Sequence, residues 1–433
     1  MAELNAKELI EQGDNSAKFQ DYNKAIEFYS KAISINPGSS FAYFKRGSVL
    51  AKARLLNQAI ADLNNCIVLN PEFSFAFYKR GTIYQAQKLF KKSLEDFNYA
   101  IRLNPDFSLA YYKRGYSYLH LTSYDKAFAD FNKTIELNPA YGNAYLHLGN
   151  TLFVKKNYDD AILNYTKVTR LDPRNARAYI SRGIAYSNKQ MFKEALNDFN
   201  LALHINPDST QALLHRGLIF SSMRRFENAL KDFQSVLKLN PDMADAYNNR
   251  GIVFFGLKDY GGAINDYNKA LSLRPNSANV YCNRGNSFYA EKKYKEALLD
   301  YDKALSIKPT LEAAFLGKGN VHASLSRYAE AIKFYTKTIN INPRYVQAYI
   351  GRGNVFMKMK FFAKALEDFT LAIEISPEYA FAYLYRGIAF KAEEHLDNAA
   401  KDFNKFLKLY RRRDPASAQV KKWLKKMDIE PIY

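Results

Sequence analysis

Eleven prolines in this chain stand 34 residues apart, and twelve glycines follow the same step. The glycines run from Gly13 to Gly387 and the prolines from Pro37 to Pro377 without a missing member. A repeat period of this length is typical of solenoids, in which one small supersecondary unit is copied and stacked. The sequence therefore predicts twelve copies of a single unit.

We number each unit from 1 to 34, with the glycine at position 8 and the proline at position 32. Unit one is then 6–39 and unit twelve is 380–413. We expect 1–5 to be an N-terminal lead-in, 6–413 to form one solenoid, and 414–433 to be a basic C-terminal capping helix and tail. The 25 residues outside the units are too few for a separate catalytic domain.

Unit six, residues 176–209, shows why each unit is predicted to be a helical hairpin. It contains two apolar stripes at helical spacing, separated by the polar stretch from Ser187 to Gln190. Asn206 and Pro207 end the second stripe, since proline lacks an N–H and clashes with the preceding helical turn. Two helices joined by a short polar turn account for the whole unit.

The pattern resembles the tetratricopeptide repeat. The shared features are an aromatic residue or leucine at position 4, Gly at 8, small residues at 20 and 27, an aromatic at 24 and Pro at 32. The resemblance covers 408 of the 433 residues, which is twelve units of 34. It implies an all-α fold, a right-handed α-α superhelix, whose inner concave groove binds extended peptide segments.

The antiparallel hairpin also predicts which positions face each other, because facing positions have a constant sum. Positions 8 and 20, 4 and 24, and 11 and 17 all add to 28. Small residues at 8 and 20 would let the two backbones approach, and aromatic pairs on either side would fill the remaining space. One hairpin cannot bury both of its faces, so neighbouring units must stack.

Arginine at position 7 and aspartate at position 23 occur together in nine units, and the other three units lack both. We interpret them as ion pairs within each hairpin, because residues that vary together tend to be in contact. The alternative is a basic stripe for nucleic-acid phosphates, which is less favoured when each arginine has its own aspartate. The nine pairs are Arg46/Asp62, Arg80/Asp96, Arg114/Asp130, Arg182/Asp198, Arg216/Asp232, Arg250/Asp266, Arg284/Asp300, Arg352/Asp368 and Arg386/Asp402.

The net charge of +20 is spread over the units rather than concentrated in one block. Such a balance favours acidic partners, but it lacks the clustered basic surface of a nucleic-acid-binding protein. We therefore favour protein or peptide partners of acidic character over nucleic acid.

Charge is concentrated only in the tail, where a short helix is predicted to start at Asp414 and Pro415. Its apolar stripe is Val420, Trp423, Leu424 and Met427. We interpret this helix as a cap over unit twelve. The alternative is docking of a basic amphipathic helix on a membrane surface.

The sequence contains no pattern that points to catalysis, a metal or a cofactor. The six histidines form no constellation, and the two cysteines lie too far apart in a linear array for a disulfide. We see no secretory signal and no run of 18 apolar residues. These features favour a non-enzymatic cytoplasmic protein, whose oligomeric state the sequence leaves open.

The face of the first helix that points away from its partner is the candidate binding groove. Units two to four place an aromatic residue at position 5 and a lysine at position 6, and these lysines motivate an acidic ligand. For the rings, packing between neighbouring first helices is the alternative. The residues are Phe44, Lys45, Tyr78, Lys79, Tyr112 and Lys113.

Units eight to eleven instead place asparagines on this face, and an asparagine side chain can both donate to and accept from a peptide backbone. This row resembles the asparagine ladder of O-GlcNAc transferase repeats; the alternative is that these are merely polar exposed residues. Position 5 is never lysine, which argues against the dicarboxylate clamp of chaperone-binding repeats. The candidate residues are Asn248, Asn249, Asn283, Asn286, Asn320 and Asn354.

The sequence thus predicts a non-enzymatic scaffold or adaptor that binds extended peptide segments in its groove. Two other functions stay open at this point. One is an RNA-binding helical solenoid, and the other is a targeting subunit of a multi-protein enzyme complex.

Overall fold

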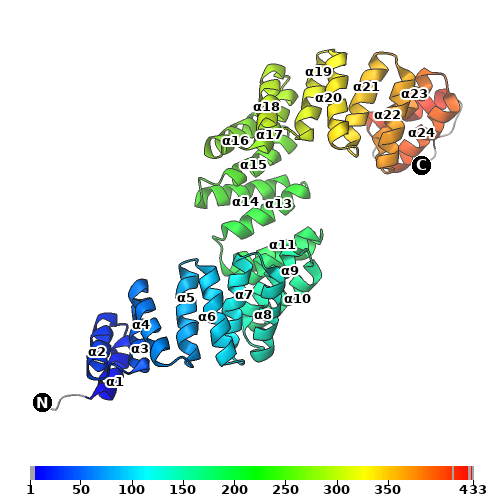
Figure 1. Cartoon of the computed structure of the whole chain (residues 1–433). Helices are drawn as coiled ribbons and strands as arrows, with labels where there is room; N and C mark the ends of the chain where they lie inside the picture. The colour runs from blue at the N-terminus through cyan, green and yellow to red at the C-terminus, as the bar shows by residue number, and fades with distance from the viewer. Residues whose placement is uncertain (1–4, 412–413, 428–430, 432–433) are drawn as a thin grey trace. The chain divides into compact units, whose positions relative to one another are not determined.

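The computed structural model describes residues 5–411, 414–427 and 431, which form twenty-five α-helices and no strand (Figure 1). The predicted helical hairpins are confirmed, one for each 34-residue unit. Their first helices are α1 (Ala6–Lys18), α3 (Ser40–Lys52), α5 (Ser74–Ala86), α7 (Ser108–His120), α9 (Gly142–Val154), α11 (Ala176–Asn188), α13 (Thr210–Ser222), α15 (Ala244–Gly256), α17 (Ala278–Ala290), α19 (Glu312–Ser324), α21 (Val346–Lys358) and α23 (Ala380–Ala392). Their second helices are α2 (Tyr22–Ile35), α4 (Leu56–Leu69), α6 (Phe90–Leu103), α8 (Tyr124–Leu137), α10 (Tyr158–Leu171), α12 (Phe192–Ile205), α14 (Phe226–Leu239), α16 (Tyr260–Leu273), α18 (Tyr294–Ile307), α20 (Tyr328–Ile341), α22 (Phe362–Ile375) and α24 (Leu396–Leu409), and α25 (Pro415–Lys426) follows.

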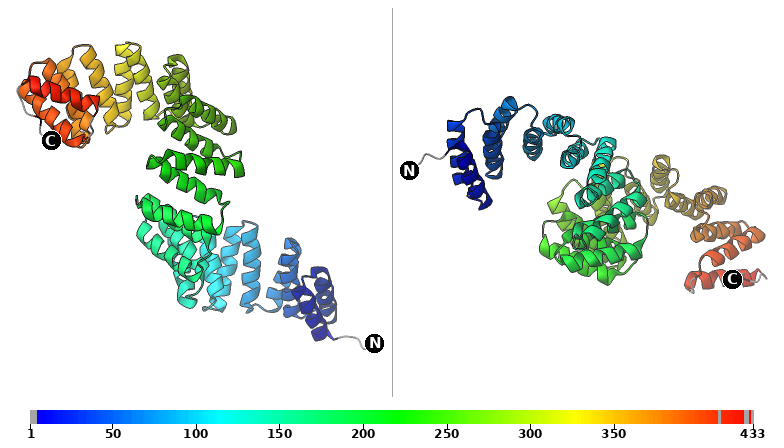
Figure 2. Two further views of the ribbon diagram at one scale, coloured as in Figure 1. Left: turned by 180° about the vertical axis from the view of Figure 1, so that it is seen from behind. Right: turned by 90° about the horizontal axis from the view of Figure 1, so that it is seen from below.

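The chain divides between Arg216 and Gly217 into two compact parts, which we describe separately. Within each part a second helix packs between two first helices, as α2 does between α1 and α3 (Figure 2). Neighbouring first helices such as α3 and α5 also contact each other, whereas neighbouring second helices do not among the described residues. The first helices therefore lie closer together and line the inner face of each part. That one continuous solenoid spans 6–413 stays a prediction.

The turn inside each hairpin is a Schellman motif with a left-handed residue at position 15. The N–H of this residue donates to the carbonyl of position 12, and the next N–H donates to the carbonyl of position 11. Its φ lies between 57° and 65° in all twelve units, and it is never glycine. The twelve residues are Gln20, Arg54, Lys88, Thr122, Lys156, Gln190, Arg224, Lys258, Lys292, Ser326, Lys360 and Glu394.

The other end of each hairpin follows the predicted Asn-Pro signal. In unit six, α12 ends at Ile205 and Asn206 caps it, with the cap N–H donating to the carbonyl of Ala202. The Asn206 side chain also accepts a hydrogen bond from the N–H of Asp208, at 3.2 Å. This turn leads the chain directly into the next first helix.

The glycine at position 8 is required because an aromatic ring lies against it. In eleven units a Cβ placed on this glycine would lie 2.5–2.9 Å from the position-24 ring of the same hairpin. In unit two, where position 24 is Leu63, the Gly47 Cβ would instead meet the carbonyl oxygen of Ala59 at 3.2 Å. The sequence reasoning expected glycine to face only alanine, and it did not place the ring there.

The same position-24 ring also contacts position 6 of the following unit. His147 stacks on Phe131 with ring centroids 5.7 Å apart, and Tyr385 stacks on Phe369 at 5.9 Å. A Cβ on Gly317 would lie 2.3 Å from the ring of Tyr301. Each buried ring is thus shared by two hairpins, which joins consecutive units.

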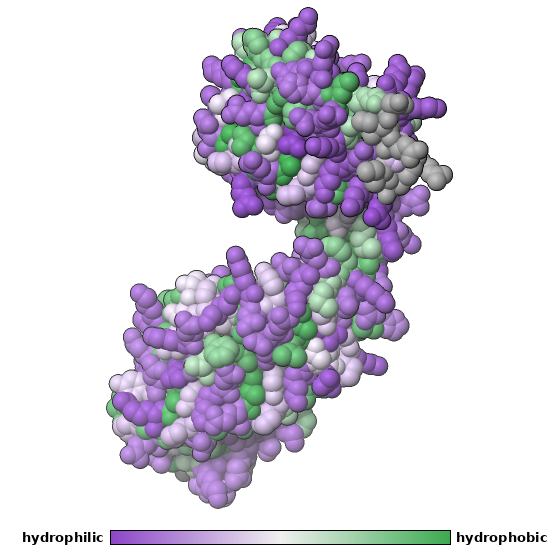
Figure 3. Space-filling model, turned by 90° about the vertical axis from the view of Figure 1, so that its right-hand side faces the viewer, coloured by the Kyte–Doolittle hydropathy of each residue, from purple (hydrophilic) through white to green (hydrophobic). Residues whose placement is uncertain are grey.

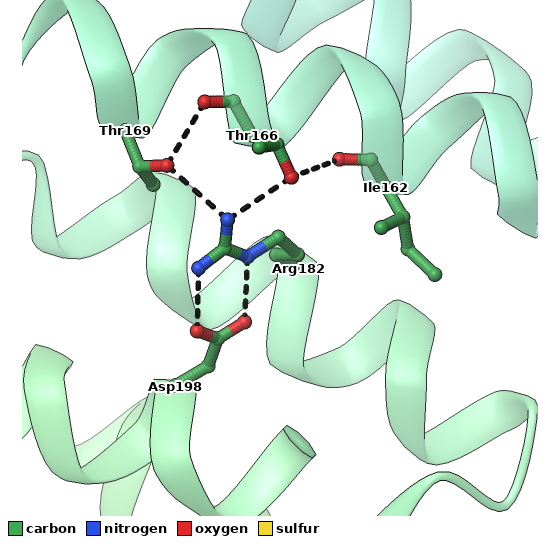
Figure 4. A network of polar contacts seen from close by, with 5 residues as sticks. All are labelled: Ile162, Thr166, Thr169, Arg182 and Asp198. Carbon is green, nitrogen blue, oxygen red and sulfur yellow. Dashed lines mark hydrogen bonds and ion pairs between the residues drawn. The ribbon is translucent and has the colours of Figure 1, made fainter.

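The predicted arginine–aspartate pairs are confirmed in eight units, each through two hydrogen bonds of 2.6–3.0 Å. In Figure 4, Arg182 holds Asp198 in this forked geometry and also donates to Thr166 of the preceding hairpin at 3.0 Å. The guanidinium lies over the ring of Tyr179, 5.5 Å from its centroid. The pair therefore links two hairpins and is structural; for Arg216 and Asp232 it stays a prediction.

The C-terminal helix α25 covers the last hairpin. The side chain of Asp414 accepts a hydrogen bond from the N–H of Ser417, and Pro415 is the first helical residue, as predicted. Val420 and Leu424 are fully buried in a cluster with side chains of α24, and Trp423 lies partly buried on the same cluster. The apolar stripe of the helix thus packs on the last hairpin, and its role as a cap stays a prediction.

The left-handed turn residue gives a first prediction. Replacing Lys88 by Gly should stabilise the protein by about 0.5–1 kcal/mol, since a non-glycine residue at positive φ is strained by about 1–2 kcal/mol and glycine loses part of this gain to chain entropy. The matched control is Gln87→Gly, where φ is −79° and destabilisation is expected. The measurement is the urea midpoint of unfolding, followed by circular dichroism. Equal effects of the two substitutions on this midpoint would contradict backbone strain at Lys88.

The second prediction concerns the buried pair of Arg182 and Asp198, whose side chains are 14% and 2% exposed. Arg182→Met and Asp198→Leu should each destabilise by about 3–5 kcal/mol, because each leaves an unpaired buried charge. The double variant should cost clearly less than the sum.

A double-mutant cycle on the exposed pair of Lys31 and Glu27 serves as the control, with a coupling of at most about 0.5 kcal/mol. Additive effects at Arg182 and Asp198 would show that the pair does not act as a unit.

Candidate functional site

The three lysines of the predicted row have different surroundings. The Nζ of Lys45 lies 2.8 Å from a carboxylate oxygen of Asp14, which also accepts a hydrogen bond from Tyr29. Lys79 and Lys113 are half-buried and have no carboxylate partner among the residues that the structure describes. Burial lowers the pKa of both ammonium groups. Lys45 is therefore already neutralised, whereas Lys79 and Lys113 are available to a ligand.

Lys79 and Lys113 lie in two adjoining hollows on the inner face of the first part. The hollow between α3 and α5 has a volume of about 260 Å³ and contains Lys79. The hollow between α5 and α7 has a volume of about 540 Å³ and contains Lys113. Both are lined by Thr82 and Ala86, and neither is lined by a carboxylate. The two hollows form one basic groove across three first helices.

The position-5 rings contribute mainly to packing. Phe44 packs edge-on against Phe73 at 4.9 Å, and Tyr78 lies 4.8 Å from Phe107. Tyr112 is only 8% exposed and contacts Tyr141 at 4.9 Å. These rings pack a first helix against the last residue of its own unit, at position 34. They therefore present less surface to a ligand than the sequence suggested.

More exposed apolar side chains of this face are at position 2. Phe41 is 47% exposed, Phe75 45% and Leu109 37%. They belong to α3, α5 and α7, the same helices that carry the lysines. The face therefore combines an apolar row with unpaired positive charge.

His147 continues the position-6 row but faces the interior. Its ring contacts Tyr112 and Phe131, both at 5.7 Å, and also Tyr116. Burial lowers the pKa of His147 to about 4, with smaller contributions from Arg177 and other nearby positive groups. The neutral imidazole is thus part of the packing between units four and five.

In the second part, most of the predicted asparagines are already hydrogen-bonded. Asn283 donates to Asn248 at 3.1 Å, and Asn248 donates to Asn249 at 3.4 Å. The side-chain oxygens of Asn286 and Asn320 accept hydrogen bonds from tyrosine hydroxyls at position 24 of their own hairpins, both at 2.8 Å. Their amide N–H groups remain available, whereas each oxygen has already accepted one hydrogen bond.

Asn354 differs, because its side chain has no hydrogen-bond partner in the described part of the chain. It lines a hollow of about 550 Å³ between α19 and α21, together with Asn320, Gly351 and Lys358. A Cβ at Gly351 would lie 2.7 Å from the ring of Tyr335, so packing requires glycine there. This hollow is a second, less charged candidate site.

The surface outside these hollows is mixed. On the face seen in Figure 3, hydrophobic surface occurs in patches bordered by hydrophilic side chains. Among the described residues there is no group of three or more His, Cys, Asp or Glu side chains arranged to hold a metal ion. No helix within them is long and apolar enough to cross a membrane.

Comparison with protein families places the chain in the tetratricopeptide repeat family. Models described as "TPR repeat" or "Tetratricopeptide repeat" match most of the chain. The matched residues are 9–39, 78–144, 149–190, 176–209, 210–243, 253–291, 278–311, 319–360 and 346–379. The chain therefore belongs to this family, as the resemblance implied, and it has the family's fold of tandem helical hairpins.

A solved structure that matches nearly the whole chain agrees on the fold. The chain is similar to a protein in the Cut9–Hcn1 hetero-tetramer of the APC/C, with 15% identity, a TM-score of 0.51, and coverage of 98% of this chain and 97% of the other. It is also similar to YrrB, described as a TPR protein with an unusual peptide-binding site (25% identity, TM-score 0.39, covering 43% and 95%). A third is MamA (27% identity, TM-score 0.36, covering 38% and 96%). Among curated proteins, none matches.

The buried histidine gives a third prediction, for stability against pH. Because the folded pKa of His147 lies below the ordinary value of 6.5, the unfolded chain binds more protons between pH 6.5 and about 4. Wild-type protein should therefore lose about 3 kcal/mol more than the His147→Phe variant when the pH falls through this window. Urea unfolding at pH 7, 5.5 and 4 measures this, with the exposed His204→Gln as control. An equal loss of unfolding free energy in wild type and His147→Phe over this pH range would contradict the prediction.

Proposed function

We propose that this protein is a non-enzymatic scaffold that holds an extended, acidic segment of another protein against the inner face of α3, α5 and α7. The observation that carries the proposal is the pair of adjoining hollows with half-buried Lys79 and Lys113 and no lining carboxylate. Eight of the position-7 arginines have their own aspartates, so the cations of this face that remain for a ligand are lysines.

The electrostatic reason is that half-buried lysines are poorly solvated and gain from an anionic partner. Lysine is among the residues least often buried without a counter-charge. An acidic side chain placed in each hollow would supply that charge and would restore the lysine pKa toward its ordinary value. Lys45 would gain nothing, because Asp14 already occupies it.

The spacing of the helices sets the spacing of the ligand's acidic residues. Packed helices lie about 8–10 Å apart, and an extended chain advances about 3.3 Å per residue. One acidic residue about every third position would therefore meet successive hollows. Apolar side chains between them could contact the exposed row of Phe41, Phe75 and Leu109.

The asparagine row of the second part is proposed as a contact for peptide backbone. Its available groups are the whole side chain of Asn354 and the amide N–H groups of Asn286 and Asn320. We assign less of the affinity to Asn248, Asn249 and Asn283, because these three side chains already bind one another.

The fourth prediction tests the lysines with labelled 12-residue peptides that carry Glu, or Lys in its place, at every third position. The acidic peptide should bind and the basic one should not. Lys79→Gln and Lys113→Gln should each weaken binding about tenfold, which is about 1.4 kcal/mol, and should reduce its salt dependence. Fluorescence anisotropy at two salt concentrations measures this.

The matched control is Lys45→Gln, which removes the same charge one unit earlier and should leave affinity within about twofold. Equal binding of acidic and basic peptides, or an equal loss in Lys45→Gln and Lys79→Gln, would contradict the assignment. Tight, salt-dependent binding of a 12-nucleotide single-stranded RNA in place of the acidic peptide would favour an RNA-binding solenoid.

A further inference from the structure

The smaller hollow, between α3 and α5, has features that the neighbouring hollow lacks. Lys52 and Lys79 both line it, and so does Ser48. The Ser48 hydroxyl oxygen is buried and has no hydrogen-bond partner. In a folded protein such a group normally has a partner, so an unpaired one inside a cationic hollow points to a ligand atom.

Without an anion, the two lysines in this hollow are held in an electrostatically unfavourable arrangement. The positive charge of Lys52 adds to burial in lowering the pKa of Lys79, so the two ammonium groups repel each other. No carboxylate lines the hollow to offset this repulsion. A single carboxylate would neutralise one of the two charges, whereas a doubly charged oxyanion would neutralise both.

The hydrogen-bonding groups also distinguish the hollow. Ser48 can donate its hydroxyl proton, but Thr82 cannot, because its hydroxyl already donates to the carbonyl of Lys79 at 2.6 Å. In the larger hollow, Gln85 is satisfied by bonds to Ser117 and the Lys113 carbonyl, and none of its described lining side chains is buried without a partner. Beside its two lysines, the smaller hollow therefore has a buried hydroxyl without a partner, which the described lining of the larger hollow lacks.

We propose that the hollow between α3 and α5 binds a phosphoryl group carried by a serine or threonine side chain of the bound segment. This rests on the proposed function for the segment itself. A phosphoserine brings a charge of about −1.5 to −2 and three acceptor oxygens, which match Lys52, Lys79 and the Ser48 hydroxyl. The volume of about 260 Å³ holds such a side chain.

The test uses full-length protein and three versions of the acidic 12-residue peptide, with serine, glutamate or phosphoserine at the central position. The phosphoserine peptide should bind at least about tenfold more tightly than the glutamate peptide. In Ser48→Ala and Lys52→Gln this preference, taken as the ratio of the two affinities measured on the same variant, should fall to about threefold or less. Fluorescence anisotropy provides the affinities, and circular dichroism checks that each variant keeps its helicity.

Lys88→Gln is the matched control, because it removes an equal charge from the adjoining hollow and should keep the preference. Equal affinity for the glutamate and phosphoserine peptides would overturn the proposal and leave the proposed function intact. Failure of all three peptides to bind would instead count against both. If inorganic phosphate alone raised the melting temperature of wild type but not of Lys52→Gln, without any preference among the peptides, the site would be one for free phosphate and the proposal would be wrong.

Discussion

The aromatic ring at position 24 is the contact on which the stacking of this protein depends. It fills the space that glycine leaves at position 8 of its own hairpin, and it also meets position 6 of the next one. A single hairpin would leave the side of this ring that meets the next unit exposed, so its burial requires a neighbour. Repeat proteins gain stability from such nearest-neighbour contacts, and here one ring provides both the internal contact and the contact between units.

The residue at position 6 is therefore constrained on the side that meets position 24 of the preceding unit and unconstrained on the side that faces the inner surface. Where the ring and its surroundings leave no space, the residue is glycine, as at Gly317 and Gly351. Where it must fill space, it is a buried imidazole such as His147. Where it lines a hollow between first helices, it is Lys79, which follows the unit with Leu63 at position 24, or Lys113. The candidate site is thus a variation on the stacking contact rather than an addition to the fold.

The arginine–aspartate pairs determine how the charge of +20 can be used. An arginine such as Arg182 is committed to Asp198 and to the preceding hairpin. The binding properties of the inner face then depend on the few cations that lack a partner. This is why the lysines of α5 and α7, and not the more regular arginine row, are the groups that we expect to select a ligand.

Much of the fold followed from the sequence, because each structural signal recurs in twelve units. Twelve copies revealed the hairpin, the Asn-Pro end and the joint presence of Arg182 with Asp198. The left-handed turn was not predicted, since its usual signal is glycine and residues such as Lys88 occupy it instead. The site was predicted only by residue type. Lys45 is paired because Asp14 lies one unit earlier, and the pattern within a single unit does not contain that information.

The central claim is that Lys79 and Lys113 have no anionic partner in the free protein and bind one in the ligand. Measuring the pKa values of these two lysines tests it most directly. Side-chain NMR titration of the amine groups, with and without the acidic 12-residue peptide, gives these values. We predict that in the free protein the pKa values of Lys79 and Lys113 lie below the ordinary lysine value, and that both rise when the peptide binds. Ordinary values for Lys79 and Lys113 that the bound peptide leaves unchanged would contradict the account.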